Sequence, residues 1–428
     1  MKLYNYPTEM EWGEIVMRPR LDTSKLNETV AEVLSNVKFN GDVAVKKYEL
    51  AFDHVALDSL LVSKKEVDEA FLSVDSELIN AISLAHANIY KFHSSQKVSP
   101  VKVETAPGVE CWQRCIAIEK VGLYIPGGTA PLFSTVLMLA IPAKLAGCRE
   151  IVLCTPPGRD GRVNPAIIAA AKIAGVDKIF KIGGVQAIAA MAYGTESVPK
   201  VYKIFGPGNQ YVMAAKQQVS LCDVAIDMPA GPSEVCVIAD EDSNAEYVAA
   251  DLLSQAEHGV DSQVLLICTS VVKLEEIKLE IEKQLRQLPR RNIASETLKN
   301  SKLVLVHDTN EAIRLSNLYA PEHLIIATKD YERLAEKVVN AGSVFLGEYA
   351  CESAGDYASG TNHTLPTHGY ATSYNGVNLD SFIRKVTFQY LTAKGVLSIG
   401  RTVEVMAANE CLDAHKKAMA LRLCNVMK

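Results

Sequence analysis

The length, composition and charge of the chain narrow the classes of protein to which it can belong. Its 428 residues exceed the size at which a single hydrophobic core keeps growing, so we expect two or more domains. Hydrophobic residues make up 48% and charged residues 22%, which is ordinary globular composition. The net charge of −6 argues against nucleic acid as a partner, because nucleic-acid binders need a basic surface.

Neither the opening residues nor the cysteine usage of the chain indicates export or a membrane span. The opening residues, MKLYNYPTEMEWGE, lack the apolar run of a signal peptide. No stretch of about 18 uncharged apolar residues occurs, so we expect no membrane span. The ten cysteines are scattered without a CxxC pair, which predicts a cytoplasmic protein with reduced thiols. For Cys111 and Cys115, the closest pair, two structural thiols are favoured over a metal knuckle or redox pair.

Residues 24–97 show the spacing of amphipathic helices. The predicted buried face of the first helix consists of Leu26, Val30, Val33, Leu34 and Val37. Gly41 interrupts this pattern. A second helix is centred on Leu78, Ile82 and Ile89.

From about residue 116, short apolar runs alternate with helical patterns. Five runs precede Gly231, namely IAIEKVGLYI, EIVLC, KIFKIG, VYKIF and DVAIDM. Five more follow it, namely EVCVIA, SQVLLIC, KLVLVH, HLIIA and SVFLG. Continuous apolar runs between helices are typical of parallel strands covered on both faces. We therefore predict an α/β fold with two Rossmann-like units, joined near Gly231-Pro232.

The region after these runs carries polar residues that suit a functional loop. Residues 347–376 are rich in Gly, Ser, Thr and Asn, and contain Cys351, Asp356, His363 and His368. A loop of this length inside a compact protein is usually functional or disordered, and these side chains favour function. The chain then ends in a helical tail, from about residue 394 to residue 428.

The simple nucleotide-binding signatures are absent from the sequence. It contains neither a GxxxxGK[ST] loop nor a GxGxxG fingerprint. Glycine-rich turns nevertheless follow apolar runs at Gly127-Gly128, Gly183-Gly184 and Gly206-Pro207-Gly208-Asn209. Glycine at such turns lets backbone N–H groups approach an anion, although α/β proteins also need glycines there for packing. The turns are compatible with a dinucleotide and do not prove one.

Several histidines lie close in the sequence to residues with carboxylate or amide side chains. Gln255 and His258 are three residues apart, so they share a helix face and suit a metal ion. Alternatively, His258 only interacts with the free carbonyls of the last helical turn. Glu322 and His323 suit a general acid/base pair, or simply an exposed turn before a strand.

Further candidate metal ligands lie closer to the end of the chain. Asp356 and His363 belong to the polar loop and could join the helical pair at zinc or a similar metal. His415 is a further candidate, although a lone histidine on an amphipathic helix is usually a surface residue.

Taken together, these segments resemble the histidinol dehydrogenase family. The matching pieces are VGLYIPGG, GGVQAIAA, FGPGN, MPAGPSEV, DLLSQAEHG, YAPEHL, GDYASGTNHTLPT and ANECLDAHK, and they extend from about residue 116 to the C-terminus. The resemblance implies oxidation of L-histidinol through the aldehyde to L-histidine. It further implies two NAD molecules and one Zn²⁺ per site, and a homodimer whose tails complete the partner's active sites.

The resemblance also implies a role for each matching residue. The metal ligands would be Gln255, His258, Asp356 and His415. The acid/base residues would be Glu322 and His323, and the metal would hold a substrate further contacted by Ser233, His363 and Glu410. The NAD contacts would be Tyr124, Gln186 and Asn209. The expected segments are residues 1–24, a discontinuous α/β domain of 25–124 and 235–377, a second α/β domain of 125–234, and a helical tail of 378–428.

Three alternative functions remain open at this stage. The chain could be a zinc-linked NAD dehydrogenase for another amino alcohol. It could be a metal-dependent hydrolase with Glu322 as the base, which would need no NAD. It could also be a catalytically silent relative, although a complete set of candidate site residues argues against this.

Overall fold

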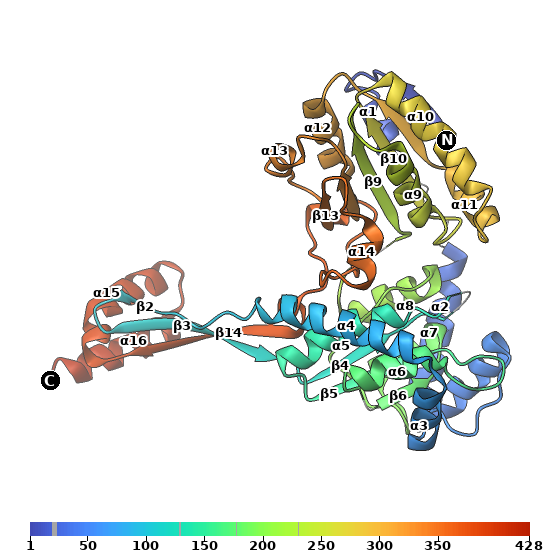
Figure 1. Ribbon diagram of the computed structural model, residues 1–428. Helices are drawn as coiled ribbons and strands as arrows, with labels where there is room; N and C mark the ends of the chain where they lie inside the picture. Colours follow the sequence, from blue (N-terminus) through green and yellow to red (C-terminus); the bar gives the residue numbers. More distant parts are fainter. Residues whose placement is uncertain (19–23, 128–129, 177, 230) are drawn as a thin grey trace.

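The computed structural model describes residues 1–18, 24–127, 130–176, 178–229 and 231–428, and it consists of two α/β units and an extended arm (Figure 1). One unit is built on a five-stranded parallel sheet and the other on a six-stranded parallel sheet. A three-stranded antiparallel sheet enters the arm. The predicted α/β class and its two parallel sheets are therefore confirmed.

The five-stranded sheet contains the five apolar runs that precede Gly231. Its strands, in spatial order, are β6 (Lys178–Lys181), β5 (Glu150–Thr155), β4 (Lys120–Tyr124), β7 (Lys203–Phe205) and β8 (Ala225–Ile226). All neighbouring strands are parallel. The strand order reverses between β4 and β7, and ligands of open α/β sheets bind at the carboxyl ends of strands at such a point.

Helices from the first half of the chain cover this sheet. They are α2 (Ser24–Tyr48), α3 (Lys64–Ser73), α4 (Ser76–Ser94), α5 (Phe133–Ala146), α6 (Pro165–Ile173), α7 (Gly184–Tyr193) and α8 (Gln210–Ser220). The expected interruption at Gly41 is present, because this residue adopts a φ of 51° inside α2. A π-helical turn, η1 (Glu49–Asp53), follows α2. Its Glu49 side chain accepts a hydrogen bond from the N–H of Gly183, which follows β6.

The six-stranded sheet contains the five apolar runs that follow Gly231, with one added strand. In spatial order the strands are β1 (Lys2–Asn5), β11 (Lys302–Leu305), β10 (Gln263–Cys268), β9 (Glu234–Ala239), β12 (His323–Ile326) and β13 (Ser343–Leu346). The helices of this unit are α1 (Trp12–Ile15), α9 (Ala245–Ala256), α10 (Val271–Leu285), α11 (Arg291–Lys299), α12 (Thr309–Tyr319), α13 (Tyr331–Ala335) and α14 (Glu352–Tyr357). Every residue of the central strands β9 and β10 is buried, as continuous apolar runs predict.

The helices of residues 24–94 pack differently from the expected grouping. The sequence analysis placed residues 25–124 with residues 235–377. In the structure α2 packs on α7 and α8, α3 packs on α6, and α4 packs on α5. The apolar faces of these helices share their cores with the five-stranded sheet. Strand β1 of the expected N-terminal segment pairs instead with β11 of the six-stranded sheet.

The arm combines segments that are far apart in the sequence. Its sheet consists of β2 (Lys102–Ala106), β3 (Val109–Ala117) and β14 (Ile383–Leu391), and its two helices are α15 (Ala393–Asn409) and α16 (Asp413–Val426). The expected helical tail of 378–428 is thus wrong for its first part, which forms the short helix η3 (Leu379–Phe382) and then β14. Cys111 and Cys115 both lie on β3, and all ten cysteines are free.

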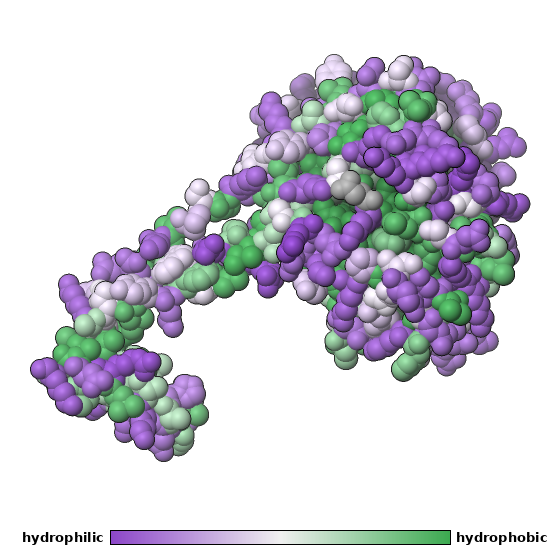
Figure 2. Space-filling view, turned by 90° about the horizontal axis from the view of Figure 1, so that it is seen from below, coloured by the Kyte–Doolittle hydropathy of each residue, from purple (hydrophilic) through white to green (hydrophobic). Residues whose placement is uncertain are grey.

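The arm exposes apolar side chains, unlike the two α/β units that bury their cores. Figure 2 shows hydrophobic residues gathered at its outer end. The exposed large residues there include Leu397, Val405, Met406, Leu412 and Leu421. Among the described helices none combines the length and the apolar character that a bilayer crossing requires.

Candidate active site

Polar residues singled out between positions 255 and 356 meet at the amino ends of β9 and β12. His323 is the first residue of β12 and pairs with Val235 of β9. Gln255 lies in the last turn of α9. Helix α14 then adds Asp356 from within the polar loop. Three sequence segments therefore contribute to one place in the fold.

His323 is the centre of a buried cluster of charged groups. Its Nδ1 atom lies 3.8 Å from Glu322 Oε2 and 3.8 Å from Glu352 Oε1, and its Nε2 atom lies 3.6 Å from Asp356 Oδ1. His323 is only 3% exposed and Glu352 only 1%. One imidazole ring therefore stands among three carboxyl groups in a largely dry environment.

Burial and charge shift the pKa values within this cluster. Burial raises the pKa of the Glu322 carboxyl and that of the Glu352 carboxyl to about 8. Burial would lower the pKa of His323, but the carboxylates of Glu352 and Glu322 outweigh it and raise that pKa to about 10. Burial also opposes ionisation of Asp356, yet the nearby imidazole of His323, 3.6 Å away, holds the pKa of Asp356 below its usual value. Such strongly shifted pKa values are typical of sites that transfer protons.

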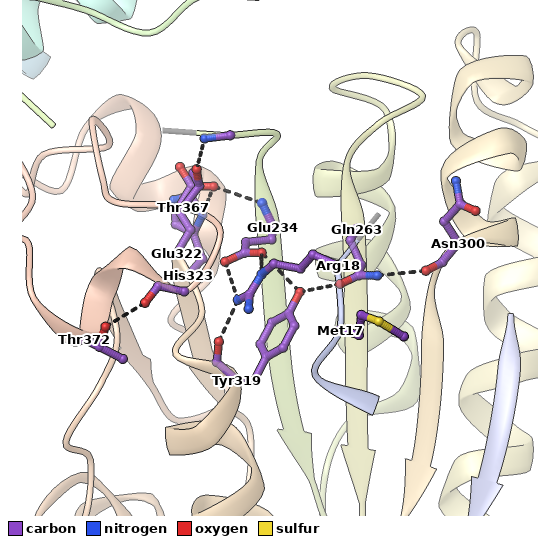
Figure 3. Close-up of polar contacts among 12 residues, drawn as sticks. Met17, Arg18, Glu234, Gln263, Asn300, Tyr319, Glu322, His323, Thr367 and Thr372 are labelled. Atoms are coloured by element: carbon purple, nitrogen blue, oxygen red, sulfur yellow. Dashed lines mark hydrogen bonds and ion pairs between the residues drawn. The ribbon is translucent and has the colours of Figure 1, made fainter. Parts of the chain in front are cut away.

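Glu322 is held in place from the neighbouring strand. The backbone N–H of Glu234, the first residue of β9, donates a hydrogen bond of 2.9 Å to Glu322 Oε2. Figure 3 shows Glu322 and His323 side by side, with Glu234 on the adjacent strand. Both Glu322 and His323 are buried, so the alternative of an exposed turn before a strand is wrong.

Potential metal ligands converge next to His323. The ligand atoms of His258, Glu352 and Asp356 all lie within 4.8 Å of one another. Gln255 is fully buried, its Nε2 atom lies 3.3 Å from His258 Nδ1, and its Oε1 atom has no hydrogen-bond partner among the described residues. A buried oxygen without a partner is costly, and an imidazole, carboxylates and an amide oxygen suit a divalent cation such as zinc. The residues present therefore fit a metal ion.

His363 connects the two α/β units at this site. Its Nδ1 atom lies 2.9 Å from the backbone oxygen of Asp356, and its Nε2 atom lies 3.2 Å from Thr135 Oγ1 on α5. A carbonyl oxygen can only accept, so Nδ1 of His363 carries a proton and Nε2 of the neutral ring accepts from the threonine. Burial lowers the pKa of His363, which favours this neutral form.

A separate cavity of about 1250 Å³ opens at the carboxyl ends of the five-stranded sheet. Tyr124, Gly127, Gly184 and Asn209 are among the residues that line it, while Gly128 lies outside the described residues. The Tyr124 hydroxyl accepts a 3.1 Å hydrogen bond from the N–H of Gly184. The cavity thus occupies the point where the strand order reverses, as dinucleotide sites do in related architectures. Its lining, as far as the chain is described, includes no member of the His323 cluster.

Gln186 lies in the wall of this cavity and is fully buried. Its Nε2 atom donates a 2.8 Å hydrogen bond to Glu49 Oε1, which also accepts a 3.0 Å bond from the N–H of Gly183. Burial raises the pKa of Glu49 to about 8. Gln186 is therefore held against the glycine turn by an acid on η1 that sequence reasoning did not single out.

The tail residues are far from the cluster within one chain. Glu410 caps α15 and α16 begins at Asp413, so a break between the two helices separates Glu410 from His415. Both side chains are exposed, and Figure 1 shows their helices at the end of the arm, away from α9 and α14. Ser233, by contrast, immediately precedes Glu234 at the amino end of β9.

Sequence reasoning missed two acids at or beside the cluster, the buried Glu352 and the half-buried Asp251. Glu352 precedes Asp356 by four residues, a spacing that places both on one face of α14. The glycine- and serine-rich sequence concealed this helix. Asp251 precedes Gln255 by four residues in α9, and burial raises the pKa of Asp251 to about 7.

Two α/β units, a large cavity at a point of strand-order reversal and a buried imidazole–carboxylate cluster define an α/β enzyme. The family model of histidinol dehydrogenase matches residues 16–423. The chain is 63% identical over 428 residues to the histidinol dehydrogenase of Bacteroides thetaiotaomicron, and the match covers 100% of both proteins. The chain therefore belongs to the histidinol dehydrogenase family.

Two further comparisons agree with this membership. The chloroplastic histidinol dehydrogenase of Arabidopsis thaliana is 53% identical over 412 residues, which are 96% of this chain and 88% of that protein. The crystal structure of histidinol dehydrogenase from Elizabethkingia anophelis matches with a TM-score of 0.98 and 52% identity, covering 100% of this chain and 99% of the other. The resemblance found in the sequence is confirmed, and with it an oxidoreductase of histidine biosynthesis.

Proposed function

We propose that the chain oxidises L-histidinol to L-histidine through L-histidinal, with two NAD⁺ and one Zn²⁺ per active site. The observation that carries the proposal is the buried ring of His323, which lies among carboxyl groups and next to a group of metal ligands. An acid/base residue beside a cation site suits the oxidation of an alcohol that also carries metal-binding nitrogens.

The proposed zinc ligands from the core of the chain are Gln255, His258 and Asp356. The unpartnered Oε1 atom of Gln255 and the convergence of the other two side chains support them. His415 would complete the set from the tail of a second copy. Zinc would supply a positive charge that holds the imidazole and the amine of the substrate. Glu352, whose carboxyl group lies beside His258 and Asp356, would contact the imidazole or the amine of the substrate.

In the first oxidation, His323 would accept the proton of the substrate hydroxyl while hydride leaves the carbinol carbon for NAD⁺. This requires a neutral ring. Without a metal ion, the carboxylate of Asp356 favours the protonated ring of His323. Asp356 is also a proposed metal ligand. We therefore expect His323 to lose its proton more readily once Asp356 is shared with a cation.

In the second oxidation, Glu322 would take a proton from water as that water adds to the aldehyde carbon of L-histidinal, and His323, protonated in the first oxidation, would donate a proton to the aldehyde oxygen to give the hydrate. His323 would then accept a proton from one hydroxyl of the hydrate, and the second hydride would pass to the second NAD⁺. Burial raises the pKa of Glu322 to about 8, which brings this carboxyl into the range of a general base that works near neutral pH. Burial of both residues would also protect the reactive aldehyde from side reactions.

Ser233, His363 and Glu410 would orient the substrate. His363 is fixed at both ring nitrogens, by Asp356 and by Thr135, which supports a positioning role. NAD⁺ would occupy the cavity at the five-stranded sheet, where Tyr124 and Asn209 line the wall and Gln186 supports the adjacent turn.

We further propose a homodimer in which the tail of each copy completes the active site of the other. The exposed positions of Glu410 and His415 support this, because neither approaches the cluster of its own chain. The apolar residues on α15 and α16 support it too, since a helical pair with such a face needs a partner surface. The ten free cysteines support a reducing, cytoplasmic setting.

One assay tests the proposed activity against its alternatives. Purified protein is mixed with L-histidinol and NAD⁺, with and without a chelator, and NADH formation is followed. We expect two NADH per histidinol and loss of activity with the chelator. Hydrolysis without NAD⁺, or NADH formation from other amino alcohols only, would contradict the proposal.

Mixing of subunits tests the shared site. His258→Ala chains and His415→Ala chains are each expected to be inactive alone. If the tails exchange, one site of each mixed dimer contains an intact core and an intact tail, so activity returns toward half of the wild-type value. Verified mixed dimers without activity would show that each tail serves its own core.

A further inference from the structure

The N-terminal segment delivers an arginine to the interior of the six-stranded unit. Arg18 follows α1, and only 11% of its side chain is exposed. Its Nε atom donates a 2.6 Å hydrogen bond to Glu234 Oε2, and its Nη2 atom donates a 2.7 Å bond to Glu234 Oε1. Figure 3 shows this two-pronged ion pair between β9 and the end of α12. A pair of this geometry fixes direction as well as charge.

The same guanidinium holds the start of the turn that leads to the acid/base pair. Arg18 Nη2 donates a 2.6 Å bond to the backbone oxygen of Tyr319, and the guanidinium carbon lies 4.1 Å from the centre of the Tyr319 ring. Tyr319 is the last residue of α12, and Ala320 follows with a φ of 49°. Such a left-handed residue is strained, so the turn needs support from its surroundings.

Glu234 connects Arg18 to Glu322 over a short path. Its side chain pairs with Arg18, while its backbone N–H donates the 2.9 Å bond to Glu322 Oε2. The Tyr319 hydroxyl further lies 3.3 Å from Glu234 Oε2 and donates a 2.9 Å bond to Gln263 Oε1. Without Arg18, the buried carboxylate of Glu234 would lack its countercharge next to the carboxylate of Glu322.

We infer that Arg18 is a positioning residue for the acid/base pair, acting through Glu234 and the carbonyl of Tyr319 to fix the orientation of the Glu322 carboxylate. This inference rests on the proposed function, because it assigns Arg18 to the step in which Glu322 activates water. The N-terminal segment thereby takes part in catalysis without touching the substrate.

The test compares the two half-reactions in four proteins: wild type, Arg18→Met, Glu234→Gln and the double variant. Arg18→Met should lower kcat for histidinal oxidation roughly 10- to 100-fold, with a smaller loss for histidinol oxidation to the aldehyde. Zinc content and the KM for NAD⁺ should stay unchanged. The double variant removes the unpaired charge and should recover at least about threefold in kcat over Arg18→Met.

Two more variants keep the test decisive. Arg18→Lys retains the charge but loses the paired hydrogen bonds, so it should show a smaller loss confined to the histidinal step. It replaces Arg18→Met if that protein does not fold. Arg314→Met is the matched control, because Arg314 also pairs with a glutamate, Glu9, and lies 5.2 Å from the Trp12 ring, but its side chain is 58% exposed. It should behave like wild type.

The outcomes separate the inference from the function on which it rests. No NADH from L-histidinol in the wild type would overturn the proposed function. If the wild type is active but Arg18→Met and Arg18→Lys slow both half-reactions equally, or release zinc, the positioning role is overturned. Absence of recovery in the double variant would also overturn it.

Discussion

The two sheets use opposite edges and different chemistry for function. At the carboxyl edge of the five-stranded sheet, glycine turns and backbone N–H groups surround a cavity of about 1250 Å³. At the amino edge of the six-stranded sheet, His323 is packed among carboxyl groups with shifted pKa values. The first edge offers space beside glycine turns, whereas the second offers charge and little space.

This difference suits the proposed binding of a dinucleotide and of a metal-bound substrate by one chain. A dinucleotide needs close backbone approach, which glycine allows, while proton transfer needs titratable groups in a dry environment. The contact between Thr135 and His363 joins the two units near the charged edge. Each edge should therefore respond separately to substitution, and the following predictions test that separation.

The largest effect is expected at the charged edge, for His258→Ala. Loss of a proposed zinc ligand should remove the metal and lower kcat about 1000-fold or more, since a metal supplies several kcal/mol to such reactions. Metal analysis and turnover are measured on the same purified sample. His86→Ala, on α4 in the other unit, is the control and should retain both the zinc content and the turnover of the wild type. Full zinc occupancy with normal turnover in His258→Ala would show that the assignment is wrong.

The next effect concerns Glu322→Gln. Because Glu322 is proposed to activate water, oxidation of histidinal should fall about 100-fold or more, and oxidation of histidinol to the aldehyde should fall less. Single-turnover measurement of each half-reaction gives the two rates. Equal losses in both would remove the division of roles between Glu322 and His323.

At the glycine edge, Gly206→Ala should weaken NAD⁺ binding without loss of zinc. Gly206 has a φ of 124°, and a Cβ atom there would lie 2.1 Å from the backbone oxygen of Tyr124. Strain of about 1–3 kcal/mol should raise the KM for NAD⁺ roughly tenfold or more. Gly13→Ala is the control, because a Cβ at Gly13 meets no atom within 4 Å. Zinc loss in Gly206→Ala would mean that the edges are not independent.

The last expected effect leaves activity aside and changes the pH dependence of stability. Burial raises the pKa of Glu49 from 4.5 to about 8, so the folded state retains a proton that the unfolded state has lost. Glu49 therefore contributes stability at low pH, and this contribution is lost as pH rises from about 4.5 through 8. Glu49→Gln mimics the protonated form, so its free energy of unfolding should fall by roughly 3–4 kcal/mol less than that of the wild type between pH 5 and pH 8. Urea unfolding at pH 5 and at pH 8 measures the free energy of unfolding of both proteins. An equal change in this free energy between the two pH values, for wild type and Glu49→Gln, would contradict the expected role of Glu49.

The apolar runs predicted the two sheets well, because strands buried on both faces leave a continuous local signal. All ten runs form strands of the expected sheets. Strand β1 was missed, since its pairing with β11 joins residues about 300 positions apart and leaves no local pattern. Strand β14 was missed for a similar reason, because its pattern of half-buried residues reflects an exposed arm.

The site was predictable where spacing on one element carried the signal. The structure places Gln255 Nε2 3.3 Å from His258 Nδ1, although α9 ends at Ala256 and His258 follows the helix and does not share its face. Glu352 was missed, although its spacing to Asp356 is helical, because glycine and serine obscured α14. Arg18 and Glu49 were not predictable from local sequence, because each acts on residues more than 130 positions away.

We propose that the charged edge and the glycine edge bind their ligands independently of each other. Titration of NAD⁺ into His258→Ala, freed of metal, measures this independence. We expect an NAD⁺ affinity within about twofold of that of the zinc-loaded wild type, together with loss of L-histidinol binding. An NAD⁺ affinity that disappears with the metal would contradict it.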